Sequence, residues 1–119
     1  RVLCRERLRR VPPQFSWVDQ RLVRDRRTWG VSAQALALYL LLITVADAEG
    51  LSYYSDDFIA RLVPLDGPAL ARARQELSAA QLIAYQKPLY QVLALDPARQ
   101  TLAEPLALNQ ILQDMERTR

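Results

Sequence analysis

The run from Ala35 to Ala46 constrains the fold more than any other feature, because it is apolar on almost every side of a helix. Ser32 precedes it as a predicted N-cap. The run is too short to span a membrane, which takes about 20 apolar residues, so it has to be covered by other parts of the chain. We expect one set of side chains to pack on neighbouring helices: Leu36, Tyr39, Leu40 and Ile43. A second set needs another cover: Leu38, Leu41, Leu42 and Val45.

Two helices joined by a very short turn are predicted after Gly50. The first begins at Ser55, whose hydroxyl can accept a helical N–H, and Pro64 ends it. The second begins at Asp66, another good N-cap, and tolerates Pro68 in its first turn. Its inward positions recur at helical spacing: Leu70, Ala73, Leu77 and Ala80.

Strand signals lie on both sides of this helix pair. Residues 51–54 suit a short strand that leaves a turn, and the β-prone runs 82–86 and 89–95 flank a tight turn at Lys87-Pro88. The predicted fold is mostly α, with a helical core of three helices, a small β-hairpin, an extra N-terminal helix and a C-terminal amphipathic helix.

The outward face of the second helix has chemistry suited to DNA. At 100° per residue, Gln75 lies near its centre, Arg74 lies at its edge, and Pro68, Ala71, Arg72, Ser78 and Ala79 share it. In a major groove, Gln can pair with adenine and Arg with guanine or a phosphate, while small residues permit close approach. The alternative is an ordinary solvated helix face.

Several short motifs follow one another along the chain: Phe15-x-x-Val18-x-x-x-Leu22, Ala37-Leu38-Tyr39, Ala46-Asp47-x-x-Gly50, Tyr54-Ser55, Ile59-Ala60, and Leu70-x-Arg72-Ala73-x-x-x-Leu77 with Leu82-Ile83. Together they resemble the winged-helix domains of bacterial plasmid and phage replication initiators and related regulators. The resemblance implies a winged helix-turn-helix, double-stranded DNA as partner and the second helix of the pair as recognition helix. Ala71 and Gly67-Pro68 depart from the family pattern, which often has polar or basic residues there.

Positive charge is concentrated at the N-terminus. Residues 1–27 contain nine arginines and three acidic residues, a net charge of +6, whereas the rest of the chain sums to −3. We predict that this region adds non-specific DNA affinity through Arg5, Arg7, Arg9, Arg10, Arg24, Arg26 and Arg27. A solvated, disordered tail is the alternative for residues 1–14, which Pro12-Pro13 separates from the folded part.

A first helix is expected to begin at Ser16, with Phe15, Val18 and Leu22 on one side as a cover for the apolar helix. Trp17 and Trp29 invite stacking hypotheses. In so small a domain, packing in the core or at its edge is the more common role for such residues.

We divide the chain into a basic arm (1–14), a winged-helix domain (15–95) and a C-terminal linker and helix (96–119). The last segment has an amphipathic spacing that predicts a helix, with its apolar side formed by Leu108, Ile111, Leu112 and Met115. This helix can fold back on its own domain or pair with a second subunit. We favour a homodimer, since winged-helix proteins often bind paired DNA half-sites.

Enzymatic chemistry finds little support. The chain has no histidine, the commonest general base and metal ligand, and its three glycines form no phosphate-binding loop. The acidic residues Asp47, Glu49, Asp56 and Asp57 are explained by turns and helix starts rather than by a metal site. The single cysteine, Cys4, excludes an intramolecular disulfide framework. We predict no cofactor, metal, small-molecule ligand or membrane association.

The predicted protein is non-enzymatic, bacterial and cytoplasmic, and it binds double-stranded DNA in replication initiation, mobile-element maintenance or transcriptional regulation. Arg72, Gln75, Ser78 and Ala71 would meet base edges, while phosphates would be contacted by Arg74, Arg61, Ser55 and Lys87. A winged-helix module that docks a protein and never reads DNA is the alternative from another class. A metal-dependent nuclease is a distant third.

Overall fold

A computed structural model describes residues 1–95 of the chain. These residues form a mixed α/β fold with four α-helices and a small three-stranded antiparallel sheet. The predicted amphipathic helix with Leu108, Ile111, Leu112 and Met115 lies outside the described residues. Within residues 1–95, no helix has the length and hydropathy needed to cross a lipid bilayer.

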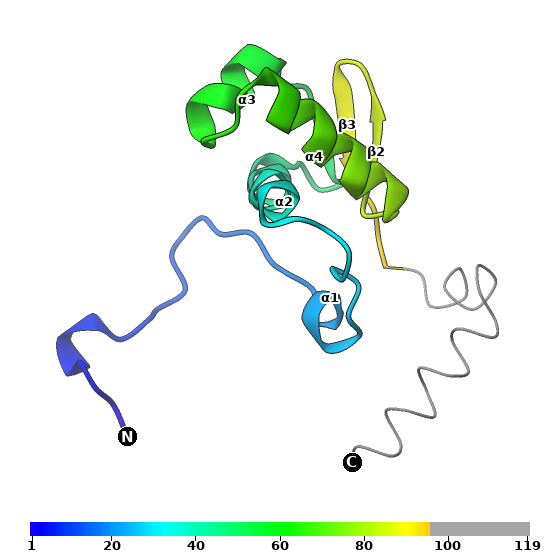
Figure 1. Ribbon diagram of the computed structural model, residues 1–119. Coiled ribbons are helices and arrows are strands. Elements are labelled where there is room, and N and C mark those ends of the chain that lie inside the picture. Colours follow the sequence, from blue (N-terminus) through cyan, green and yellow to red (C-terminus); the bar gives the residue numbers. More distant parts are fainter. Residues whose placement is uncertain (96–119) are drawn as a thin grey trace, which may run out of the picture.

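The elements follow one another in the predicted order from the apolar helix onward (Figure 1). A single 3-10 turn (η1, Arg5–Arg7) and a short helix precede them (α1, Arg21–Arg24). The remaining elements are α2 (Ala33–Val45), β1 (Leu51–Ser52), α3 (Asp56–Leu62), α4 (Gly67–Ala79), β2 (Ile83–Gln86) and β3 (Leu89–Val92). This layout is compatible with a winged helix.

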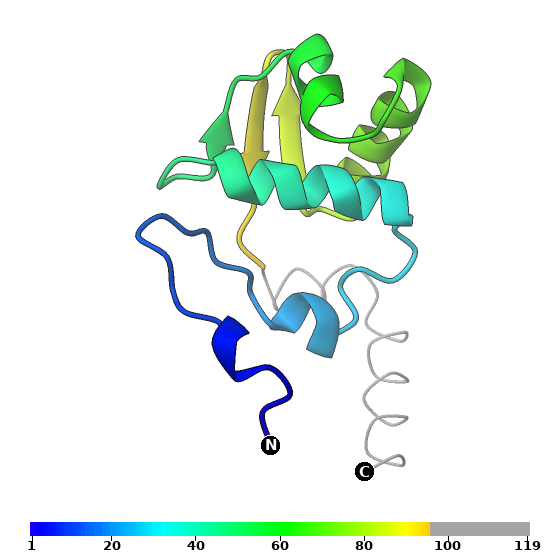
Figure 2. The same ribbon diagram turned by 90° about the vertical axis from the view of Figure 1, so that its left-hand side faces the viewer.

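Helix α2 lies in the middle of the molecule, between α4 on one side and α1 on the other (Figures 1 and 2). Its predicted N-cap is confirmed, since Ser32 Oγ accepts a hydrogen bond from the N–H of Ala35. Its buried stripe consists of Ala35, Leu38, Tyr39 and Leu42.

The predicted distribution of faces on α2 is wrong for Leu36 and Leu40, whereas Tyr39 is buried and Ile43 packs against the core as expected. Leu36 and Leu40 were expected to pack on the neighbouring helices but are exposed, Leu40 at 61%. Leu38 and Leu42 are fully buried instead. A run that is apolar on every side contains no information about which side turns inward, so only the tertiary contacts decide it.

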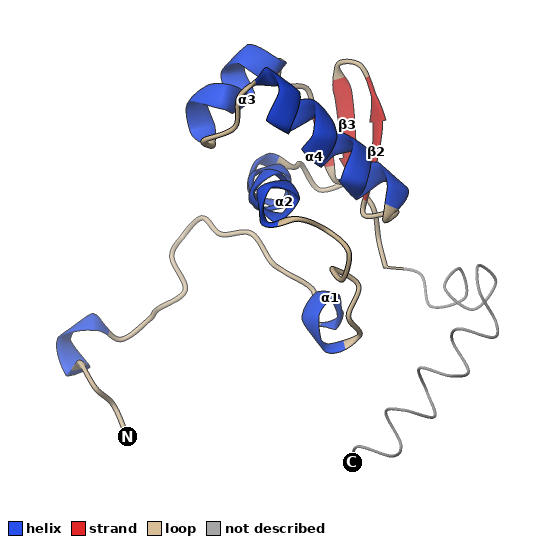
Figure 3. Ribbon diagram, in the orientation of Figure 1, coloured by secondary structure: helices blue, strands red, loops and turns tan. Residues whose placement is uncertain are grey.

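Side-chain caps fix the starts of α3 and α4, as predicted. Ser55 Oγ accepts from the N–H of Phe58 at 3.2 Å, and Asp66 Oδ1 accepts from the N–H of Ala69 at 2.8 Å. Helix α3 ends at Leu62, two residues before Pro64. The short turn between the two helices is visible in Figure 3.

The strands pair in the order β1-β3-β2. Strands β2 and β3 form the predicted hairpin around Lys87-Pro88, and Leu51 of β1 lies opposite Gln91 of β3. Gly50 permits this pairing. Its φ of +87° is in the left-handed region, and a Cβ added there would lie 2.6 Å from the carbonyl oxygen of Val92.

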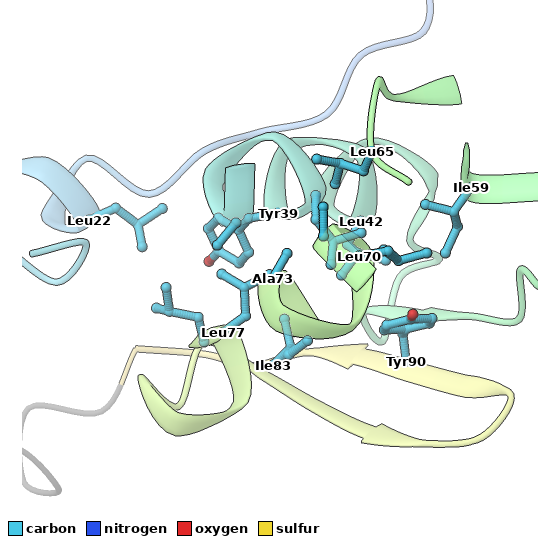
Figure 4. Close-up of a cluster of buried hydrophobic side chains, with 14 residues drawn as sticks. Leu22, Tyr39, Leu42, Ile59, Leu65, Leu70, Ala73, Leu77, Ile83 and Tyr90 are labelled. Carbon is cyan, nitrogen blue, oxygen red and sulfur yellow. The ribbon is translucent and has the colours of Figure 1, made fainter. Parts of the chain in front are cut away.

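One hydrophobic core joins the helices to the sheet (Figure 4). Tyr90 contributes from β3 and Ile83 from β2, while Leu22 is the only buried residue among residues 1–31. The helices and loops supply most of the remainder: Leu38, Leu42, Ile59, Leu65, Leu70, Ala73, Leu77 and Leu82.

The predicted N-terminal helix beginning at Ser16 is wrong. Residues 15–19 have no regular structure, and Ser16 Oγ donates a hydrogen bond to the carbonyl of Thr44 at 3.2 Å rather than capping a helix. Asp19 accepts from the N–H of Arg21 instead, at the start of the four-residue helix α1. The hydroxyl that was expected to start a helix thus ties the segment to the end of α2.

Two tryptophans expected in the core or at its edge are exposed. Trp17 is 76% exposed and Trp29 is 71% exposed. Phe15 and Val18, the proposed cover of α2, are also exposed, and of that set only Leu22 is buried. The arginine-rich sequence around them has no continuous apolar stripe that would draw these rings inward.

Candidate nucleic-acid interface

The outward face of α4 is exposed as the helical wheel predicts. Ala69, Leu70, Ala73 and Leu77 are buried, which fixes the rotation of the helix about its own axis. Four residues predicted to contact DNA are exposed on the remaining surface: Ala71, Arg72, Gln75 and Ser78. Neither Arg72 nor Gln75 has a hydrogen bond or ion pair to another side chain within residues 1–95.

A polar contact also fixes α4 against the start of α2. Glu76 accepts hydrogen bonds from the backbone N–H of Ser32 at 2.7 Å and from the Ser32 hydroxyl at 3.0 Å. The carboxylate of one helix therefore supports the N-cap of the other. The two residues are 44 positions apart, so no local sequence signal identifies the pair.

Arg74, at the edge of this face, is held inside the fold. Its side chain is only 14% exposed and forms an ion pair with Asp56, Nη1 to Oδ1, at 2.8 Å. The same Nη1 donates to the Tyr90 hydroxyl at 2.6 Å, and the guanidinium carbon lies 4.5 Å from the ring centroid of Tyr85. Arg74 thus links the first turn of α3 to the β2–β3 hairpin across α4.

The titration of this cluster follows from its contacts. The hydrogen bond from Arg74 lowers the pKa of Asp56, and the hydrogen bond to Asp56 raises the pKa of Arg74. Burial raises the pKa of Tyr90. Because its donors already have partners, Arg74 is the predicted DNA contact that the geometry favours least, and this contact stays a prediction.

Two other predicted phosphate contacts lie on elements next to α4 in the sequence. Arg61 is in the last turn of α3, and Lys87 is in the turn of the hairpin. Both are exposed, and neither has an ion pair within the described residues. The Ser55 hydroxyl is also exposed but is already engaged in capping α3.

The N-terminal arginines lie elsewhere. The arm and α1 are on the opposite side of α2 from α4 in both views (Figures 1 and 2). Arg26 is exposed there and lies over the ring of Trp29, whereas Arg27 is half-buried and its Nε has no hydrogen-bond partner in the described part of the chain. The remaining predicted arginines of this region are exposed: Arg5, Arg7, Arg9, Arg10 and Arg24.

A cleft of about 570 Å³ lies between residues 15–17 of the N-terminal segment and residues 91–95 at the end of β3. Phe15 and Trp17 line one side, and Tyr39 and Leu93 line others. None of the residues predicted to bind DNA borders it. In residues 1–95, no group of three or more His, Cys, Asp or Glu side chains is close enough to hold a metal ion.

The turn after α2 accounts for Asp47, one of the clustered acidic residues. Its Oδ1 accepts from the N–H groups of Glu49 and Leu51, both at 2.9 Å. Asp56 forms the ion pair with Arg74.

Comparisons with models of known protein families, with curated proteins and with solved structures found no match for this chain.

Proposed function

We propose that this protein binds double-stranded DNA, without catalysis, by placing the exposed face of α4 in the major groove. The observation that carries the proposal is the pair Arg72 and Gln75, which are exposed and have no side-chain partner within residues 1–95 on a helix that is otherwise fixed. The proposed arrangement is a winged helix-turn-helix, in which α3 and α4 form the helix pair and the β2–β3 hairpin forms the wing.

The dimensions of α4 suit this role. Its 13 residues span about 20 Å, and a B-DNA major groove is about 12 Å wide, enough to admit one helix. The side chains that approach base edges would be Gln75, which suits adenine, and Arg72, which suits guanine. Ala71 and Ser78 are small enough to allow close approach to the groove.

The charges near α4 support a moderate affinity. Residues 51–95 contain four basic and four acidic side chains, but three of the acidic ones have internal partners: Asp56, Asp66 and Glu76. Arg61, Arg72 and Lys87 are the cations without an ion pair there. Two phosphate contacts, from Arg61 and Lys87, correspond to a slope of about −2 in a plot of log K against log salt concentration.

The biological setting that we propose is replication initiation, mobile-element maintenance or transcriptional regulation in a bacterial cytoplasm, with the protein acting as a homodimer. Two copies would present two α4 helices to paired half-sites about one helical turn of DNA apart. The residues expected to join the copies, Leu108, Ile111, Leu112 and Met115, are in the part of the chain outside residues 1–95.

The test begins with selection of bound duplexes from a random pool. We expect Gln75→Ala to lower the preference for the selected sequence about tenfold, since a bidentate contact contributes about 1–3 kcal/mol of discrimination. Gln34→Ala, a change of the same type at an exposed position of α2, is the matched control and should have no effect. Fluorescence anisotropy with selected and scrambled duplexes measures both.

Arg72→Ala should relax the preference for guanine at one position of the selected sequence, at a cost of about 1–3 kcal/mol, whereas Arg61→Ala should weaken binding to every duplex and make the salt slope shallower by about 1. Folded Arg72→Ala and Gln75→Ala variants that bind duplexes as the wild type does would contradict the proposal. A wild-type protein that selects no sequence would do the same, and would favour the alternative of a protein-docking module.

A further inference from the structure

Three exposed aromatic rings lie in the N-terminal region. Trp17 and Trp29 are the only tryptophans of the chain, and Phe15 is 67% exposed. Leaving a large apolar side chain in water forgoes the favourable free energy of burying it. Phe15 and Trp17 line the same cleft, and exposed apolar rings that gather in this way mark binding surfaces.

Arginines accompany these rings in the sequence. Arg26 lies over Trp29, with its guanidinium carbon 4.5 Å from the ring centroid. Among the three acidic residues of 1–27, Asp19 is already paired with Arg21 at 2.7 Å. Arg24 and Arg26 are exposed and have no ion pair within residues 1–95. The region is thus both cationic and aromatic.

We infer that this surface, formed by residues 1–29, binds single-stranded nucleic acid. Unpaired bases would stack on Trp17 and Trp29, while the arginines would contact the phosphates. Exposed aromatic side chains along a positively charged surface are the combination that binds single strands without sequence preference. Because Trp29 is 71% exposed with Arg26 over it, much of the indole stays accessible to a base.

This inference goes beyond the proposed function, because base stacking depends on Trp17 and Trp29, which have no part in the proposed duplex contacts. The segment 15–29, which carries these rings and arginines, lies on the opposite side of α2 from α4 (Figures 1 and 2). A duplex is a poorer ligand for these rings, since its bases are already stacked on one another. Trp17 also lines the cleft of about 570 Å³, which offers a base a recess beside the ring.

Arginine and tryptophan together also occur at membrane surfaces, but there they usually belong to one amphipathic helix. Here the only helical turns in residues 1–29 are the three residues of η1 and the four residues of α1. The rings and charges are therefore not arranged along a helix that could lie in a bilayer interface. Single-stranded nucleic acid remains the ligand class that uses both features.

Intrinsic tryptophan fluorescence tests the inference, since both tryptophans belong to this surface. We expect an unlabelled oligothymidylate of about 20 nucleotides to quench the emission to saturation. Dextran sulfate, a polyanion without bases, should give much less quenching at matched charge. Equal quenching by both polymers, or none by the oligonucleotide, would overturn the inference.

Variants identify the rings, with binding of a labelled oligothymidylate measured by anisotropy. Trp17→Leu and Trp29→Leu should each weaken binding about tenfold, since one stacked base contributes about 1–3 kcal/mol. Trp29→Phe, which keeps an aromatic ring, should restore part of the loss. The leucine and phenylalanine variants binding equally well would contradict stacking.

Two further measurements separate this inference from the duplex proposal. The double variant Arg72→Ala, Gln75→Ala should keep its single-strand affinity, and the tryptophan variants should keep their preference for the selected duplex. A tryptophan blue shift with anionic phospholipid vesicles but no response to the oligonucleotide would overturn the inference in favour of a membrane ligand. Self-association that buries the tryptophans and leaves no oligonucleotide response would overturn it in favour of a protein partner.

Discussion

The region from α2 to β3 and the region before it have opposite characters. The first contains all but one of the buried core residues and is held by N-caps, the Glu76–Ser32 contact and the Arg74 cluster. The second has Leu22 as its one buried residue but carries most of the arginines. Packing and positive charge are thus separated, and the surface that suits base recognition is distinct from the one that has the most charge.

The largest expected difference between the regions concerns stability. Leu42→Ala removes a side chain with no exposed area and should lower the free energy of unfolding by about 2–5 kcal/mol. Leu40→Ala on the same helix is the control, since that side chain is 61% exposed, and should change it by less than about 0.5 kcal/mol. Urea unfolding measures both, and equal losses would contradict the assigned faces of α2.

The two regions can also be compared at Gly50 and Gly30, which share a left-handed backbone conformation. Both have a positive φ, +87° and +83°, but only a Cβ at Gly50 would collide with backbone atoms. We expect Gly50→Ala to cost about 2–4 kcal/mol through strain and displacement of Val92. Gly30→Ala should cost about 1 kcal/mol through strain alone. Similar costs in thermal or urea unfolding would mean that β1 and β3 are not paired as described.

Arg74 and Arg72 should behave in opposite ways. Arg74→Ala leaves Asp56 without its partner and removes contacts to two tyrosines, so we expect a loss of about 1–2 kcal/mol. Arg72→Ala should leave stability unchanged within about 0.5 kcal/mol and instead weaken duplex binding. An Arg74→Ala variant as stable as the wild type would contradict the structural role of Arg74.

The smallest expected effect tests whether the N-terminal segment has a fixed structure. The hydrogen bonds from the Arg21 side chain, and then from its N–H, lower the pKa of Asp19 from 3.8 to about 2. Because the folded-state pKa is lowered, any stabilisation is complete above about pH 4 and is lost as the pH falls toward 2. An NMR titration of the carboxyl should give about 2, and Arg21→Ala should raise it. An ordinary value in the wild type would mean that residues 19–21 are not held together.

The sequence predicted α3, α4 and the hairpin because local chemistry determines them. Ser55 and Asp66 cap the helices, and the inward spacing of Leu70 and Leu77 on α4 is unambiguous. The face of α2 was not predictable, since a helix that is apolar all round gives no preferred side. The Ser16–Thr44 contact, 28 positions apart, likewise has no local signal.

The candidate site was predictable to a similar degree. The exposure of Arg72 and Gln75 follows from the helical wheel. The partial burial of Arg74 does not, because it depends on hydrogen bonds to Asp56 and Tyr90, which are 18 and 16 positions away. Trp17 and Trp29 were predicted to pack in the core or at its edge, because tryptophan is usually buried, but both are exposed. Arg74 differs from the prediction because it makes tertiary contacts, and the tryptophans differ because no element within residues 1–95 covers them.

Simultaneous binding tests the separation of the two surfaces most directly. A labelled duplex carrying the selected sequence is bound to the protein, and unlabelled oligothymidylate is added at constant ionic strength while duplex anisotropy and tryptophan emission are recorded. We expect the emission to be quenched while the duplex stays bound. Release of the duplex in step with the quenching would show that both ligands compete for one surface, and would contradict the division between α4 and the N-terminal region.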